Sequence, residues 1–339
     1  MFRTALAAAF VTAMALVPAQ AGPQYDQSPE DLEWVMAKLK EWLPGEWSAY
    51  PQVHYERTVR MPEEGEHDNW YRTFALIDAP QVGETVFYGQ INVDKRSGGL
   101  MGRTQIVYTA RIDEERGAVV MNGQPPADAG RFIDLQDKPE LWSEVPPLDM
   151  SKLHCDFLWR RDGDQLFAVL EGQKEEYQKY GFGTCNYMSE EAEAEFFADA
   201  EWVLTPETLW IYDINTMGGQ QFIGREDRTH VRLSRSRPYS CAVSDANGAR
   251  TLNAYDRGFE TEVAADGGSM SLMLLRAEYP DDDAGLEDQL KLMLLAPDSG
   301  DVAAETVGAP EAEEIELAAA GVTATCSLQQ AFPPLSEAD

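Results

Sequence analysis

The sequence predicts an all-β protein in which antiparallel strands form a barrel or sandwich behind an N-terminal helix, followed by a second, small β domain. Three observations predict this fold class. Short runs rich in Val, Ile, Tyr, Phe and Thr recur along the chain, turn residues separate them, and no strand–helix–strand rhythm indicates a parallel sheet. The chain has 339 residues, of which 44% are hydrophobic, enough to bury the cores of two domains.

The first 21 residues have the pattern of a secretory signal peptide. Arg3 is followed by an uncharged apolar run from Ala5 to Val17, then Pro18, and Ala19-Gln20-Ala21 precedes the expected cleavage point. The alternative is a short uncleaved membrane anchor, although the run is too short to span a bilayer comfortably. We therefore expect an exported protein, periplasmic or secreted, with no membrane span after signal cleavage.

One amphipathic helix is expected next. Ser28 is a natural N-cap, Pro29 suits the first turn, and Pro44-Gly45 ends the segment. Apolar residues recur at three- and four-residue steps at Leu32, Val35, Met36, Leu39, Trp42 and Leu43. We expect Trp34, Trp42 and Trp47 to form core contacts between this helix and the barrel, because large aromatic side chains favour burial.

The barrel domain is predicted over residues 28–237. Its strands are expected at Tyr71 to Ile77, Glu84 to Val93, Thr104 to Ile112, Ala118 to Asn122, Phe157 to Arg161, Gln165 to Glu171, Trp202 to Leu204, Leu209 to Ile214, Gln221 to Gly224 and His230 to Ser234. Asp162-Gly163 indicates a hairpin, and the acidic segment from Ser189 to Ala200 is expected to form a brief helical turn. A closed barrel of this size has room for one small ligand.

A boundary is expected at Pro238 to Cys241, so that residues 238–330 form the small all-β domain and residues 331–339 a disordered tail. The alternative is that this part packs on the barrel as an extension. Its strands are expected at Thr251 to Tyr255, Phe259 to Ala264, Met270 to Tyr279, Leu290 to Ala296, Ala303 to Val307 and Glu313 to Leu317.

The chain has four cysteines, Cys155, Cys185, Cys241 and Cys326. An even number in an exported protein indicates disulfides, and of the three possible connectivities the sequential one keeps each pair within one predicted domain. No CxxC or HxxxH spacing occurs, so no metal site is expected.

Charge excludes two classes of partner. The 59 Asp and Glu residues outnumber the 27 Lys and Arg residues, for a net charge of −32. A surface of that sign repels nucleic acid and anionic membranes. No serine-hydrolase, phosphate-loop or zinc-protease motif occurs, so the sequence identifies no catalytic residue. Glu171 and Asp213 would form an acid–base pair only if they met across the barrel, and a surface role is favoured for both.

A polar row marks the candidate binding site. Tyr88 and Gln90 share a strand face, as do Arg103 and Gln105 on the next strand, because side chains repeat every second residue. If both faces point into the barrel, they supply convergent donors, and the planar fork of Arg103 favours a carboxylate. The alternative is the solvated face of an ordinary hairpin.

These residues belong to a series of weak motifs in a recognisable order. The series consists of Trp42-Leu43-Pro44-Gly45-Glu46-Trp47-Ser48 with Gln52, Phe87-Tyr88-Gly89-Gln90, Arg103-Thr104-Gln105-Ile106-Val107-Tyr108, His154-Cys155, Phe167 to Gly172, Cys185-Asn186-Tyr187, Trp210 to Asp213 and Gln220 to Gly224. In this order they resemble the CpcT/CpeT family of phycobiliprotein chromophore lyases, over about residues 31–234. Gly89, His154 and Gln105 depart from the family pattern, and the signal peptide and C-terminal domain lie outside it.

The resemblance implies a lipocalin-like antiparallel barrel that holds an open-chain tetrapyrrole, a bilin, and helps attach it to a cysteine of an acceptor protein. It implies that Tyr88, Gln90, Arg103, Gln105 and Tyr108 bind the ligand, with Arg103 holding a propionate. Fold carries over between distant proteins more readily than activity does. Two alternatives therefore stay open: an exported carrier of a small apolar ligand without catalysis, and a structural module whose barrel is filled by side chains.

Overall fold

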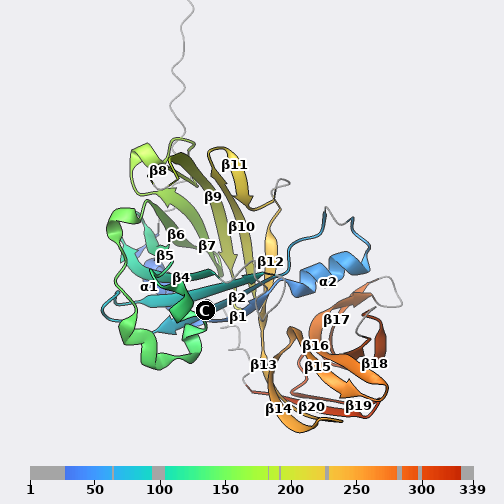
Figure 1. The fold of residues 1–339 in the computed structure, drawn as a ribbon. Helices are drawn as coiled ribbons and strands as arrows, with labels where there is room; N and C mark the ends of the chain where they lie inside the picture. The colour runs from blue at the N-terminus through green and yellow to red at the C-terminus, as the bar shows by residue number, and fades with distance from the viewer. Residues whose placement is uncertain are drawn as a thin grey trace, which may run out of the picture.

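The computed structural model describes residues 27–62, 65–93, 104–181, 183–190, 192–225, 229–280, 285–296 and 300–329. The predicted signal peptide, the predicted tail at 331–339 and Arg103 lie outside the described residues. The described chain is mostly antiparallel β-strand with few helices, which confirms the predicted all-β class (Figure 1).

Ten of the twelve strands in the largest sheet close into a barrel, in the order β10-β12-β1-β2-β3-β4-β5-β6-β7-β9, with β9 pairing back onto β10. Their bounds are β1 Gly45–Ser48, β2 Trp70–Ile77, β3 Val86–Val93, β4 Thr104–Asp113, β5 Ala118–Gln124, β6 Cys155–Asp162, β7 Gln165–Gly172, β9 Ala194–Leu204, β10 Thr208–Met217 and β12 Val231–Ser236. β8 (Thr184–Ser189) and β11 (Gln220–Ile223) extend β9 and β10 beyond the closed part.

Helix α1 (Pro29–Trp42) closes one end of the barrel. Its N-cap is Ser28, as the sequence predicts, and Ser28 and Asp31 bond each other's backbone in a capping box. Leu39, Trp42 and Trp47 are buried in the barrel core, and Trp34 packs against it, which confirms the expected helix–barrel contacts.

A long excursion between β5 and β6 covers part of the barrel's outer face. It contains four short 3₁₀ helices: η2 (Ala129–Phe132), η3 (Leu135–Asp137), η4 (Pro139–Glu144) and η5 (Met150–Lys152). Phe132, Leu135 and Val145 form a second buried cluster with Val86, Tyr88 and Val107 of β3 and β4. This cover decides the orientation of the predicted polar row.

The C-terminal part contains two four-stranded sheets, β14-β13-β20-β19 and β15-β16-β17-β18, around a shared apolar core. The bounds are β13 Pro238–Asp245, β14 Gly248–Tyr255, β15 Arg257–Ala265, β16 Gly268–Pro280, β17 Leu286–Leu295, β18 Val302–Gly308, β19 Glu314–Ala319 and β20 Val322–Leu328. Helix α2 (Tyr50–Thr58) packs against β16, where Tyr50 joins a cluster with Met273, Leu275 and Met293 (Figure 1).

Two disulfides pair the cysteines sequentially, as the sequence favours. Cys155–Cys185 joins β6 to β8, and Cys241–Cys326 joins neighbouring positions of β13 and β20. Two disulfides indicate an oxidising compartment. Among the helices of the described residues, none has the length and apolar character that crossing a membrane requires.

The helical turn expected from Ser189 to Ala200 is wrong. Most of that segment is the start of β9, which pairs with β10 along its length. Its buried residues alternate at Ala198, Ala200, Trp202 and Leu204. The period of two, set by pairing and burial, overrides the local helix preference of the alternating Glu and Ala residues.

Candidate ligand-binding site

The predicted polar row lies on the outer face of the barrel, not inside it. Tyr88, Gln90 and Gln105 are buried beneath the 3₁₀ excursion. The Tyr88 hydroxyl donates to Gln90 Oε1 at 2.8 Å and contacts the carbonyl oxygen of Phe132 at 2.8 Å. Gln90 Nε2 donates to Asp134 Oδ1 at 2.8 Å, and Gln90 Oε1 accepts from Asp134 N at 2.9 Å. The expectation that this face lines the lumen is therefore wrong.

The alternation of large apolar residues explains why the polar row faces outward and not into the lumen. Phe87, between Val86 and Tyr88, joins the same core as Trp159 and Trp202, which come from the opposite wall. Strand β3 therefore turns Phe87 inward, and its neighbours must point outward. Residue polarity alone predicts the wrong lumen-facing side. The polar residues can be buried on the outer face because the 3₁₀ excursion supplies their hydrogen-bond partners.

Tyr108 does point into the lumen, on the opposite strand face from Gln105. Its ring lies over two glycines of the flanking strands: a Cβ on Gly89 would come within 2.9 Å of the ring, and one on Gly123 within 2.3 Å. Phe74 packs on the same ring at 6.4 Å between centroids. Gly89, a departure from the family pattern, thus makes room for an inward tyrosine, whose pKa burial raises to about 12.

Arg72 is the most unusual group of the interior. It is 2% exposed, and its guanidinium lies 5.1 Å from the ring centroids of both Trp70 and Trp202. Its Nε has no hydrogen-bond partner among the described residues, and burial lowers the pKa of the guanidinium. A buried cation with an unused donor is costly unless something pairs with it.

Three tryptophan side chains of the barrel interior resemble Arg72 in having buried donor groups. The Nε1 atoms of Trp70, Trp159 and Trp202 are all buried, and none has a hydrogen-bond partner among the described residues. Native proteins leave few buried donors unpaired, so several in one interior indicate water or a ligand. The barrel interior therefore presents donors to an acceptor-bearing molecule.

Asp213 supplies the opposite charge. Burial raises its pKa to about 6, an effect that Arg72 and the hydrogen bond from Asn215 Nδ2 (2.5 Å) partly offset. A cavity of about 30 Å³ lies beside it and is also lined by Trp70 and Ile211. Glu171 instead pairs with Arg116 at 3.6 Å on the outer face, so Glu171 and Asp213 do not form a pair.

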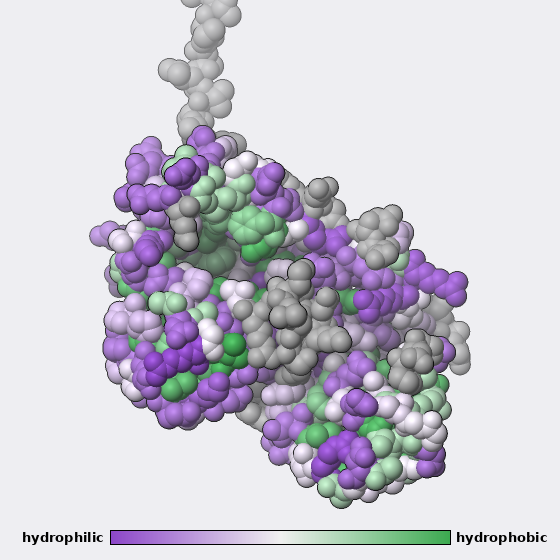
Figure 2. Space-filling view, in the orientation of Figure 1, coloured by the Kyte–Doolittle hydropathy of each residue, from purple (hydrophilic) through white to green (hydrophobic). Residues whose placement is uncertain are grey.

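The end of the barrel opposite α1 carries an apolar rim. The ring of Phe196 lies 4.9 Å from that of Tyr187 and 6.4 Å from that of Phe222, between centroids, and Phe222 and Met188 are exposed. Figure 2 shows apolar surface gathered in the hollow below β8–β11. Apolar surface of this kind marks an interaction site.

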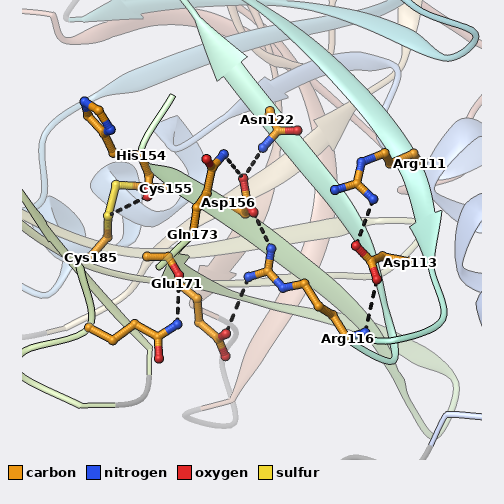
Figure 3. Close-up of polar contacts among 12 residues, drawn as sticks. Arg111, Asp113, Arg116, Asn122, His154, Cys155, Asp156, Glu171, Gln173 and Cys185 are labelled. Atoms are coloured by element: carbon orange, nitrogen blue, oxygen red, sulfur yellow. Dashed lines mark hydrogen bonds and ion pairs between the residues drawn. A yellow bond between two sulfur atoms is a disulfide. The ribbon is translucent and has the colours of Figure 1, made fainter. Parts of the chain in front are cut away.

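A second polar cluster, around Asp156, contrasts with the interior. Asp156 is 3% exposed and accepts hydrogen bonds from Asn122, Arg116 and Gln173 (Figure 3). The Cys155–Cys185 disulfide lies beside it. Every bond of this cluster joins residues of the chain, so it holds β5, β6 and β7 together on the outer face.

Neither Arg72 nor Asp213 was singled out by the sequence as a binding residue. The available signal was an arginine on the same strand face as Trp70 and Phe74, because a charge within an apolar row predicts a buried charge. No group of three or more His, Cys, Asp or Glu side chains that could hold a metal occurs in the described part of the chain.

No model of a known protein family matches the chain, and no curated protein matches it. Among solved structures, the chain is similar to the CRL protein of Arabidopsis in selenomethionine form, with a TM-score of 0.43 and 10% sequence identity. The similarity covers 60% of this chain and 98% of that one. At this TM-score it decides nothing about function, so the barrel interior has to be interpreted from its own geometry.

Proposed function

We propose that this protein binds a bilin, or a related planar molecule with carboxylates, inside the barrel. One observation carries the proposal: the buried guanidinium of Arg72 lies 5.1 Å from the ring centroids of Trp70 and Trp202, with its Nε unpartnered among the described residues. A guanidinium suits a carboxylate, and the rings suit a flat apolar body. The CpcT/CpeT resemblance supports the choice of a bilin, which carries both features.

The remaining interior groups have complementary roles in this proposal. Arg72 holds a propionate, and the carboxylate of Asp213 accepts hydrogen bonds from pyrrole N–H groups. The indole N–H groups of Trp70, Trp159 and Trp202 are donors for the carbonyl oxygens at the ends of a bilin. Binding would therefore use both charges and the unpartnered donors.

Titration of the purified protein with phycocyanobilin and with biliverdin, followed by absorbance, tests the proposal. We expect Arg72→Met to weaken binding about 10- to 100-fold, the range for a charge-assisted hydrogen bond. The matched control is Arg111→Met, because Arg111 lies on the outside of β4 in an exposed ion pair with Asp113. Binding that is absent, or equal in both variants, refutes the site. Arg103→Met tests the sequence-based assignment separately.

Attachment of the bilin to an acceptor cysteine is the further activity that the resemblance implies. The acceptor thiol would add across a double bond of the bilin, forming a C–S bond while the thiol proton passes to a bilin carbon. The barrel would contribute positioning. Incubation of the loaded protein with an apo-phycobiliprotein tests this step: a covalent adduct supports a lyase, whereas binding without an adduct supports a carrier.

The favoured alternative to a bilin is a small apolar ligand without carboxylates, bound without chemistry. The apolar rim formed by Tyr187, Phe196 and Phe222 suits either ligand. Native mass spectrometry of the protein isolated from its own cells separates them by the mass of the retained molecule. We place the protein in an exported, oxidising compartment because of its two disulfides.

A further inference from the structure

A carboxylate, an imidazole and a hydroxyl are in contact beside the small cavity that Asp213 also lines. Glu56 on α2 contacts His67, which precedes β2, and His67 contacts Thr229, which precedes β12. Glu56 Oε1 lies 2.5 Å from His67 Nδ1, and His67 Nε2 lies 3.1 Å from Thr229 Oγ1. Figure 1 shows α2 and β12 side by side, so the fold brings together three segments that are distant in sequence.

The contacts of Glu56 determine how the imidazole is oriented. Its other oxygen, Oε2, accepts from the backbone N of His67 at 2.8 Å. The short contact of Oε1 with Nδ1 places the ring proton on Nδ1, so Nε2 is left as an acceptor for the Thr229 hydroxyl. Both side chains are shielded, with 8% of His67 and 5% of Glu56 exposed.

Gln52 also borders the imidazole. Its Oε1 accepts from the backbone N of Arg232 at 2.7 Å, which leaves its Nε2 at 3.1 Å from His67 Nδ1. A protonated Nδ1 cannot accept from this amide, so Gln52 only packs against the ring, and the nearer Glu56 carboxylate accepts the Nδ1 hydrogen bond. Glu56 therefore orients the imidazole, whose other nitrogen is directed at a hydroxyl.

Arg225 contacts the same hydroxyl from another direction. Its Nε donates to Thr229 Oγ1 at 3.1 Å, while its Nη atoms donate to the carbonyls of Glu66 and Gly65 at 2.5 and 3.1 Å. The carbonyl bonds hold the loop that carries His67 against Thr229. The positive charge therefore lies beside the hydroxyl oxygen and favours loss of its proton.

A small cavity adjoins the hydroxyl. Thr229 and Arg225 line the cavity of about 30 Å³, together with Trp70, Ile211 and Val231. At roughly 10–15 Å³ per water it holds about two waters, the size of an acetyl group. Asp68 and Asp213 also line it, so it disfavours an anionic acyl chain. Thr229 itself is exposed, so a substrate can reach it from solvent.

We propose that Glu56, His67 and Thr229 form a hydrolytic site for neutral esters of short acyl groups, acetyl esters above all. His67 Nε2 takes the hydroxyl proton as Thr229 Oγ1 attacks the carbonyl carbon, and Arg225, which donates to Oγ1, favours loss of that proton. The ester C–O bond breaks, and the alcohol leaves with the proton from His67. Water then attacks the acyl-threonine, with His67 again as base, and releases the acid and the free hydroxyl.

The purely structural interpretation is that this cluster anchors the loop before β2. Only the hydrolytic interpretation predicts a covalent acyl-threonine. The test is therefore hydrolysis of p-nitrophenyl acetate and p-nitrophenyl butyrate by the full protein, followed by mass mapping of the acylated peptide. We expect an acetyl group on Thr229, a preference for acetate, and a loss of about 100-fold or more in Thr229→Val. Thr229→Ser should retain activity because it keeps the hydroxyl.

Thr58→Val is the matched control, because Thr58 is an exposed threonine whose hydroxyl donates to the backbone carbonyl of His54. It should hydrolyse like the unmodified protein. Arg72→Met should also stay active, so failure of bilin binding leaves this proposal standing. Full activity in Thr229→Val, or an acetyl group at another residue, overturns it. If His67→Gln does not fold, the exposed Thr229 variants still decide the question.

Discussion

The two faces of the same barrel strands treat polar groups in opposite ways. On the outer face, Tyr88 and Gln90 of β3 bond to each other and to the 3₁₀ excursion, whereas Asn92 Oδ1 further along this face has no partner among the described residues. On the inner face, Arg72 and Trp70 of β2 keep donors that lack partners among the described residues. A buried polar row therefore belongs to the scaffold when its hydrogen-bond partners lie within the chain. Buried polar atoms without such partners indicate a ligand or water.

This distinction assigns separate energetic roles to the two faces. Removing an outer group breaks hydrogen bonds that close within the chain, which costs stability. Removing an inner donor that has no partner among the described residues breaks no such bond, so we expect ligand binding to fall more than stability does. Four measurements test this distinction between the two faces.

The largest effect on stability is expected at the two disulfides. Replacing Cys241 and Cys326 by Ser opens a loop of 85 residues and should lower the free energy of unfolding by about 4.6 kcal/mol, under the chain-entropy model. Replacing Cys155 and Cys185 opens a loop of 30 residues and should cost about 3.7 kcal/mol. Denaturant titration measures both, and only the second pair, which joins β6 to β8 beside the apolar rim, should weaken bilin binding. Equal bilin binding by the two variants would show that β8 does not contribute to the binding site.

The outer face is tested by Gln90→Leu. The substitution leaves the Tyr88 hydroxyl and both Asp134 groups without their bonds to Gln90, so we expect a loss of about 2–4 kcal/mol in the free energy of unfolding. The control is Gln220→Leu on β11, where the side chain is exposed. Unchanged stability in Gln90→Leu, measured by denaturant titration, would contradict a scaffold role for the outer row.

The inner face is tested by Arg72→Met without ligand. Methionine removes the buried charge, which is favourable, but also the charge that offsets Asp213, so the free energy of unfolding should change by less than about 2 kcal/mol. Thermal and denaturant unfolding of the ligand-free protein measure it. A loss of more than about 2 kcal/mol would show that Arg72 belongs to the scaffold, like Gln90.

The sequence was sufficient for the fold class because its strands alternate clearly and their turns are well marked. It was also sufficient for α1, whose Ser28 cap and apolar steps are local signals. It missed α2, which begins at Tyr50 with Pro51 and has a weak apolar face. It also missed β13 and β20, whose short alternating runs depend on pairing with each other.

The candidate site was less predictable because it depends on which strand face turns inward. Tyr88 and Gln90 follow the same alternation as Phe87 and Gly89, and only packing across the barrel chooses between the two sets. The excursion over residues 129–152 has no pattern that indicates where it folds back. Pairing between distant strands, such as β9 with β10, placed Asp213 inside, and no local signal carries that information.

The smallest effect concerns Asp213 and its pH dependence. Burial raises its pKa to about 6 from the ordinary value of 3.8, so above pH 6 the folded state carries a charge that it disfavours. This group's destabilising contribution falls as the pH drops below about 6 and disappears below 3.8, where both states are protonated. One pKa unit corresponds to about 1.4 kcal/mol, so allowing for its partial exposure we expect Asp213→Asn to gain about 1–2 kcal/mol at pH 7 and progressively less as the pH falls toward 3.8. Asp31→Asn is the control of opposite sign, because hydrogen bonds from Ser28 lower the pKa of Asp31. A constant difference between Asp213→Asn and the unmodified protein, in unfolding measured from pH 4 to pH 8, would show that Asp213 is not held in a desolvated interior.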